Sequence, residues 1–191
     1  MIIAGDNQRT APLAGACIYE RGNLLLGASE AVFSASRAYR YRLSRTWGDP
    51  SRRVMWIMLN PSTADALADD PTIRRCTGFS KAWGFGGLIV VNLFALRATD
   101  PRELAVHARP AGPANDQFIG EAALGCAPFV VAAWGAHPAA ADRAGQVTRL
   151  VTGEGAGLMC LGVTKAGHPK HPLYVRKDAA LVPYRRGEGV A

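Results

Sequence analysis

The chain has 191 residues, of which 49% are hydrophobic and 19% are charged, and its net charge is +7. This length and apolar content support one substantial core and exclude disorder over most of the chain. No apolar run approaches the roughly 18 residues of a membrane-spanning helix, and the start of the chain lacks the pattern of a secretory signal. We therefore expect a cytoplasmic protein without a membrane partner. The excess of Lys and Arg favours a polyanionic partner such as DNA.

Residues 1–35 form the least regular part of the sequence. Gly, Ala and Ser recur throughout this segment, and we expect loops with at most an edge strand. From Tyr39 to Trp47, apolar and polar residues alternate with a period of two. This alternation predicts a half-buried strand at the antiparallel edge of a sheet.

The rest of the chain alternates short apolar runs with segments of helical spacing. The runs are Val54–Leu59, Leu88–Val91, Phe129–Ala133 and Leu158–Val163. The helical segments are 71–83, 101–108, 114–124 and 139–152. Asp70 and Pro71 are suited to the N-cap and first position of the first helix, which Gly84 ends.

Runs that are apolar on both faces and separated by helices are typical of a parallel sheet covered on both sides. We therefore predict one α/β domain over residues 1–191. Its fold would be a three-layer α/β/α sandwich with a mostly parallel central sheet and an antiparallel edge. Residues 176–191 form a basic C-terminal tail.

Unusual polar residues follow each of the four apolar runs. They are Asn60, Asn92, the pair Trp134 and His137, and the pair His168 and His171. In an open parallel sheet, ligands bind in the crevice beyond the carboxyl ends of the strands. One such residue alone is usually a strand cap, but four successive strand ends of this kind indicate a shared site.

The chemistry of this predicted site rests on neutral hydrogen-bonding groups. The sequence has no paired Cys or His spacing for a metal, no phosphate-binding loop and no nucleophile elbow. We therefore expect neither a metal nor a cofactor. An Asn amide matches the adjacent carbonyl and N–H of a pyrimidine edge, and a neutral His donates to an oxygen that gains charge as a bond breaks. These amide and imidazole groups suit the recognition and release of a nucleobase.

Four segments carry a resemblance to a known family. They are Leu59–Ser62, Gly87–Leu93, Val130–Gly135 and Lys165–Leu173, within residues 54–174. In type and order they resemble the motifs of the uracil-DNA glycosylases, which flip a base out of DNA and excise it. The chain as a whole is most similar to a bacterial domain family that has these motifs but no named activity. The resemblance implies a glycosylase-like fold and a monomeric DNA repair enzyme that needs no cofactor.

The resemblance of the first segment implies which residues would bind the attacking water. Asn60 would hold the attacking water, and Pro61 and Ser62 would contact the substrate. A nearby carboxylate would assist, with Asp65 as the first candidate and Asp69 and Asp70 as alternatives.

The resemblance also implies which residues would bind the base. Asn92 would read the edge of the base. Phe79 would stack on the extruded base, although ordinary packing between helix and sheet explains this residue equally well.

The last segment has one residue more than the family pattern. His168 matches when counted from the preceding strand, and His171 when counted from the following Pro-Leu. We favour His171 for stabilising the departing base, since the loop after it must press Leu173 into the duplex as a wedge. Phosphate contacts would come from three basic residues, Lys165, Lys170 and Arg176.

Two other functions fit the same residues. One is a hydrolase of free nucleotides or modified bases, which would bind mononucleotides but not DNA. The other is a non-catalytic nucleic-acid binding module, because a fold does not determine a function.

Overall fold

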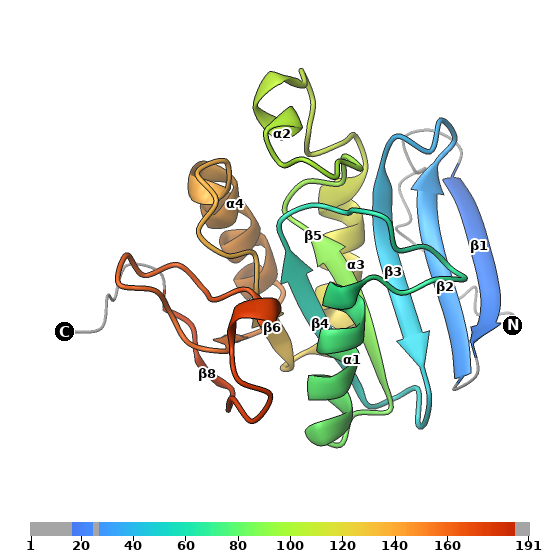
Figure 1. The fold of residues 1–191 in the computed structure, drawn as a ribbon, viewed down its shortest axis with the longest axis vertical. Helices are drawn as coiled ribbons and strands as arrows, with labels where there is room; N and C mark the ends of the chain where they lie inside the picture. The colour runs from blue at the N-terminus through green and yellow to red at the C-terminus, as the bar shows by residue number, and fades with distance from the viewer. Residues whose placement is uncertain (1–16, 25–26, 186–191) are drawn as a thin grey trace, which may run out of the picture.

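An eight-stranded mixed sheet runs through the part of the chain that the computed structural model describes, residues 17–24 and 27–185 (Figure 1). The strands are β1 (Cys17–Leu24), β2 (Gly27–Ser34), β3 (Arg40–Thr46), β4 (Arg53–Met58), β5 (Gly87–Asn92), β6 (Val130–Ala132), β7 (Leu158–Cys160) and β8 (Val182–Pro183). They are ordered β1-β2-β3-β5-β4-β6-β7-β8 across the sheet.

Parallel pairing is confined to the centre of this sheet. Strands β5, β4, β6 and β7 pair in parallel, and all pairings involving β1, β2, β3 and β8 are antiparallel. The prediction of a mostly parallel sheet was therefore wrong for the whole sheet, where three pairings are parallel and four are antiparallel. Short connections between β1, β2 and β3 allow only antiparallel neighbours, because a parallel neighbour needs a long crossover.

The strands β1 and β2 were missed by the sequence prediction, which expected loops with at most one edge strand there. They form a hairpin whose register runs from Cys17 opposite Ser34 to Leu24 opposite Gly27. Gly, Ala, Asn and Glu, which are depleted in strands, recur in this hairpin, so its sequence gives little strand signal. Residues 1–16 and 186–191, parts of the two predicted irregular ends, lie outside the described residues.

Helices cover both faces of the parallel strands, which confirms the predicted three layers (Figure 1). Helix α1 (Pro71–Ala82) lies on one face, and α3 (Asn115–Cys126) and α4 (Ala140–Gly153) lie on the other. The short helix α2 (Glu103–Val106) and the 3-10 turn η1 (Pro172–Tyr174) lie in the connections. No helix of the described residues is both long and apolar enough to cross a membrane.

The two cores explain why the central strands are apolar on both faces. In β4, Val54, Trp56 and Met58 belong to the core under α1. Met55 and Ile57 belong to the core under α3 and α4. Successive side chains of a strand point to opposite faces, so a strand between two helical layers must be apolar throughout.

The start of α1 follows the sequence signals. The Asp70 carboxylate accepts a hydrogen bond from the Ile73 amide at 2.8 Å, and Pro71 occupies the first turn. Gly84 follows the helix with a φ of 78°, a left-handed conformation that glycine adopts without strain. The helix predicted over 101–108 is shorter, Glu103–Val106, since only Leu104 of it is buried.

Candidate active site

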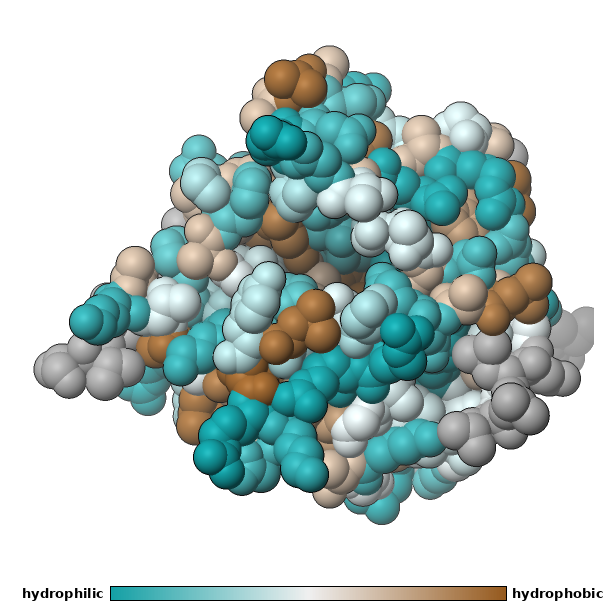
Figure 2. Space-filling model, in the orientation of Figure 1, coloured by the Kyte–Doolittle hydropathy of each residue, from teal (hydrophilic) through white to brown (hydrophobic). Residues whose placement is uncertain are grey.

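A cavity of about 420 Å³ lies at the carboxyl ends of the parallel strands. Its lining combines the ends of β4 and β5, the segment after β6, the start of α1 and the η1 loop. Figure 2 shows this face hollowed below the lobe that carries α2. Six polar or aromatic residues that the sequence placed after strands meet here: Asn60, Ser62, Asn92, Trp134, His137 and His171.

Asn92 ends β5 at the inner wall of this cavity. Its side chain is 1% exposed, and neither its Nδ2 nor its Oδ1 has a hydrogen-bond partner. Buried polar atoms are almost always paired, because an unpaired one costs about 1–3 kcal/mol. With both amide atoms unpaired at a cavity wall, Asn92 has one donor group and one acceptor available for a ligand.

Asn60 follows β4 and is oriented by the backbone around it. Its Nδ2 donates to the Ala98 carbonyl at 2.7 Å and to the Pro61 carbonyl at 3.1 Å. A carbonyl oxygen only accepts hydrogen bonds, so the group that faces these two carbonyls is the amide nitrogen, and Oδ1 remains as an acceptor. Asn60 therefore offers the cavity an acceptor in a defined orientation, whereas the buried Pro61 does not line the cavity.

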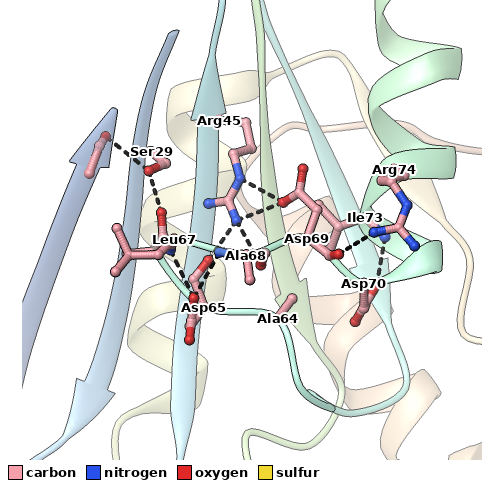
Figure 3. A network of polar contacts seen from close by, with 12 residues as sticks. Ser29, Arg45, Ala64, Asp65, Leu67, Ala68, Asp69, Asp70, Ile73 and Arg74 are labelled. Atoms are coloured by element: carbon pink, nitrogen blue, oxygen red, sulfur yellow. Dashed lines mark hydrogen bonds and ion pairs between the residues drawn. The ribbon is translucent and has the colours of Figure 1, made fainter. Parts of the chain in front are cut away.

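The segment between Asn60 and α1 is held to the sheet by side chains of β2 and β3 (Figure 3). The Ser29 hydroxyl donates to the Ala66 carbonyl at 2.5 Å, and the Arg45 guanidinium donates to the Asp65 carbonyl at 2.6 Å. Arg45 also forms an ion pair with Asp69 at 2.7 Å. These bonds give a segment without regular structure a fixed place beside the cavity.

Of the three carboxylates named as candidates in this segment, only Asp70 lies at the cavity. Asp65 does not line the cavity, since its Oδ1 accepts the amides of Leu67 and Ala68 at 2.8 and 2.9 Å and closes a turn. Asp69 is occupied by its ion pair. Asp70 lines the cavity, because its place as the N-cap of α1 sets it at the inner end of the helix.

The two histidines of the last segment lie in different places. His171 lines the cavity, and its Nδ1 accepts the Leu173 amide at 3.3 Å. In the neutral imidazole the proton then sits on Nε2, which becomes a donor. His168 does not line the cavity: its amide and carbonyl close a turn with Thr164. Of these two histidines, His171 is therefore the one with access to a ligand in the cavity.

Burial lowers the pKa of His171, and the nearby Asp70 carboxylate only partly opposes this shift. A histidine whose pKa is lowered by folding binds its proton more weakly in the folded protein than in the unfolded chain. Stability is then lost as the pH falls below the ordinary value of about 6.5. His171→Gln is expected to lose less unfolding free energy than the wild type between pH 7 and pH 5, measured by urea unfolding. Under the same conditions His168→Gln should keep the wild-type loss, and equal losses in all three proteins would contradict this assignment.

Phe79 belongs to the core and not to the cavity. Its ring packs against Trp56 and Trp83, with centroid separations of 6.2 and 5.5 Å. The Arg75 guanidinium covers the ring at 4.9 Å from its centroid. Of the two interpretations of Phe79, packing between helix and sheet is the one that the structure supports, because α1 turns this side chain towards the sheet.

Arg75 also positions the loop that carries His171. Its guanidinium donates to the Val175 carbonyl at 2.5 Å and to the Pro172 carbonyl at 3.3 Å. Leu173 and Tyr174 are exposed in this loop, and Tyr174 lines the cavity. The three predicted phosphate-binding residues, Lys165, Lys170 and Arg176, are exposed too and lie outside the cavity lining.

Arg40 is a cavity residue that the sequence prediction missed. It begins β3, the strand next to β5, and is 2% exposed. Arg40 alternates with Tyr39 and Tyr41 in a two-residue period, so it was assigned to the solvent face of an edge strand. β3 is not an edge strand, because β1 and β2 extend the sheet beyond it.

Residues 40–173 match the family DUF1643, described as a protein of unknown function. The matched segment contains every residue that lines the cavity except Tyr174. No curated protein and no solved structure matches the chain. Within residues 17–24 and 27–185, no group of three or more His, Cys, Asp or Glu side chains is placed to hold a metal ion.

Proposed function

The chain belongs to the family DUF1643, and we propose that it is a monofunctional DNA glycosylase. It flips uracil or a closely related pyrimidine out of DNA and hydrolyses the bond between base and sugar. The single observation that carries this proposal is the buried Asn92, which lines the cavity and whose two amide atoms have no hydrogen-bond partner. A pyrimidine edge, with a carbonyl beside a ring N–H, pairs with both of these atoms.

The other cavity residues supply the groups that hydrolysis needs. Asn60 Oδ1 accepts a hydrogen bond from the attacking water, and the Asp70 carboxylate takes the water proton. The water oxygen bonds to the sugar carbon C1′ as the bond to the base nitrogen breaks, and the electron pair remains on the base. His171 Nε2 donates to a base oxygen that gains negative charge. The attacking water and the departing base are therefore each assigned a partner.

The surface beside the cavity suits a duplex from which a base has been removed. Leu173 and Tyr174 project from the η1 turn into solvent, where an apolar side chain can fill the gap in the base stack. Lys170, exposed in the same loop, is available to a DNA phosphate. The net charge of +7 favours the approach of DNA.

Base release from oligonucleotides tests the proposal directly. Labelled strands with one uracil, single-stranded or opposite guanine or adenine, are incubated with the protein and then cleaved by alkali at abasic sites. We expect cleavage at the uracil position. Absence of cleavage on all three substrates would refute uracil excision. Hydrolysis of free nucleotides alone, or DNA binding without product, would assign the cavity to a different function.

Replacing Asp70 separates the proposed proton acceptor from its role as a helix cap. Asp70→Asn keeps a good N-cap, so the unfolding free energy is expected to change by less than about 0.5 kcal/mol. The rate of base release should fall by about 10²- to 10⁴-fold, since general-base catalysis contributes that much. Asp65→Asn is the matched control and should retain the wild-type rate. Equal rates for the two variants in single-turnover assays would contradict the assignment of Asp70.

A further inference from the structure

The strongest unexplained feature of the cavity is the cation of Arg40. This side chain is 2% exposed, and its Nη1 donates to the Ala64 carbonyl at 2.5 Å. Its Nε has no hydrogen-bond partner, and no carboxylate of the described residues lies within ion-pairing distance of the guanidinium. A buried charge is normally paired, because leaving it alone is strongly unfavourable.

The more distant charges around Arg40 do not replace a partner. The carboxylates of Asp70 and Asp65 favour its charged form, whereas Arg97 and Arg45 oppose it. Burial lowers the pKa of Arg40 to about 10, so the side chain remains a cation at neutral pH. When Asp70 takes the proton of water, its carboxylate becomes neutral and no longer favours the charged form of Arg40. Arg40 is therefore least compensated at the moment when the departing base becomes an anion.

The position of Arg40 distinguishes a base from a phosphate as its partner. Arg40 begins β3 beside the end of β5, where the buried Asn92 lies. In a complex with DNA, phosphates stay at the surface and only the flipped base reaches the buried end of the cavity. The group that meets Arg40 is then an oxygen or a nitrogen of the base.

We propose that Arg40 stabilises the negative charge that develops on the departing base, so that the cavity binds a base anion more tightly than a neutral base. This inference rests on the proposed function and adds a catalytic residue and a substrate class to it. When the bond from C1′ to the base nitrogen breaks, the electron pair spreads over the ring, and Arg40 donates hydrogen bonds to the charged ring. Bases with an acidic ring N–H are the class that gains most from this cation.

Binding of free bases tests the inference without requiring any catalysis. The probes are 5-nitrouracil, whose ring is ionised at neutral pH, and uracil and thymine, which are neutral. By titration calorimetry, the wild type should bind 5-nitrouracil about ten-fold more tightly than thymine, the increment of a charge-assisted hydrogen bond. Arg40→Gln should abolish the preference and Arg40→Lys should keep part of it. An equal preference in the wild type and Arg40→Gln, or no preference in the wild type, would overturn the inference.

Base release provides a second readout that a merely structural role would not change. Oligonucleotides with 5-fluorouracil contain a better leaving group than those with uracil. Arg40→Gln should slow the release of uracil at least ten-fold more than the release of 5-fluorouracil. If Arg40 only fastened the Ala64 segment, both rates would fall equally, and the inference would fail while base excision stood. If anion binding depends on Arg40 but no base is ever released, the excision proposal fails and the anion site stands.

Discussion

Asn92→Leu is expected to raise the free energy of unfolding by about 1–3 kcal/mol and to abolish base release. The wild-type side chain buries two polar atoms without partners, and a leucine in the same place removes that cost. The same change removes the amide that pairs with the base, and a hydrogen-bonding site that loses its groups loses recognition by orders of magnitude. Urea unfolding measures the stability, and single-turnover assays on uracil-containing strands measure the activity.

Asn115 provides a matched control for this experiment. It is also 1% exposed, but its Nδ2 donates to the carbonyls of Asn92 and Leu93 at 2.9 and 3.1 Å. Asn115→Leu should therefore destabilise the protein by about 1–3 kcal/mol, because it removes both hydrogen bonds and leaves the Leu93 carbonyl with only Arg143 Nε as a side-chain donor. If both variants were destabilised alike, Asn92 would have a structural role and the central observation behind the proposed function would be lost.

Phe79→Ala is expected to lower the free energy of unfolding by about 3–5 kcal/mol, as for other buried aromatic residues replaced by alanine. The ring supports Trp56 and Trp83 and lies under the Arg75 guanidinium. Thermal or urea unfolding measures this loss. If Phe79 instead stacked on the base, its replacement would weaken substrate binding with little change in the free energy of unfolding.

Phe79→Leu keeps most of the apolar volume and serves as the control for Phe79→Ala. It should cost about 1.5 kcal/mol or less and leave the KM for uracil-containing DNA unchanged. A ten-fold rise in KM at near wild-type stability would restore the interpretation of Phe79 as the residue that stacks on the base.

The parallel centre of the fold could be predicted because its signals are local and repeated. A strand between two helical layers must be apolar on both faces, and this pattern identified β4, β5, β6 and β7. The topology of parallel strands then places their carboxyl ends together, so Asn60, Asn92 and His171 could be assigned to one site from the sequence. The choice of His171 over His168 needed only the constraint on the loop that follows.

The remainder of the site depends on contacts that leave no local pattern. The pairing of β1 and β2 comes from the backbone, and it makes β3 an interior strand with a buried Arg40. Local contacts set the carboxylates of Asp65 and Asp70, in a turn and at the N-cap of α1, whereas Arg45 of β3 anchors the segment through the Asp65 carbonyl. The contributions of β1, β2 and β3 cannot be seen in a window of neighbouring residues.

The contacts that hold this connecting segment have a consequence for how its sequence can vary. Ser29 and Arg45 bind the backbone carbonyls of Ala66 and Asp65 (Figure 3). Arg40 binds the backbone carbonyl of Ala64. Every amino acid supplies a carbonyl, so evolution can exchange many side chains here without detaching the segment. The donors on the strands have no such freedom. Substrate specificity can therefore diversify through the side chains of this segment, while the three strand residues that anchor it stay unchanged.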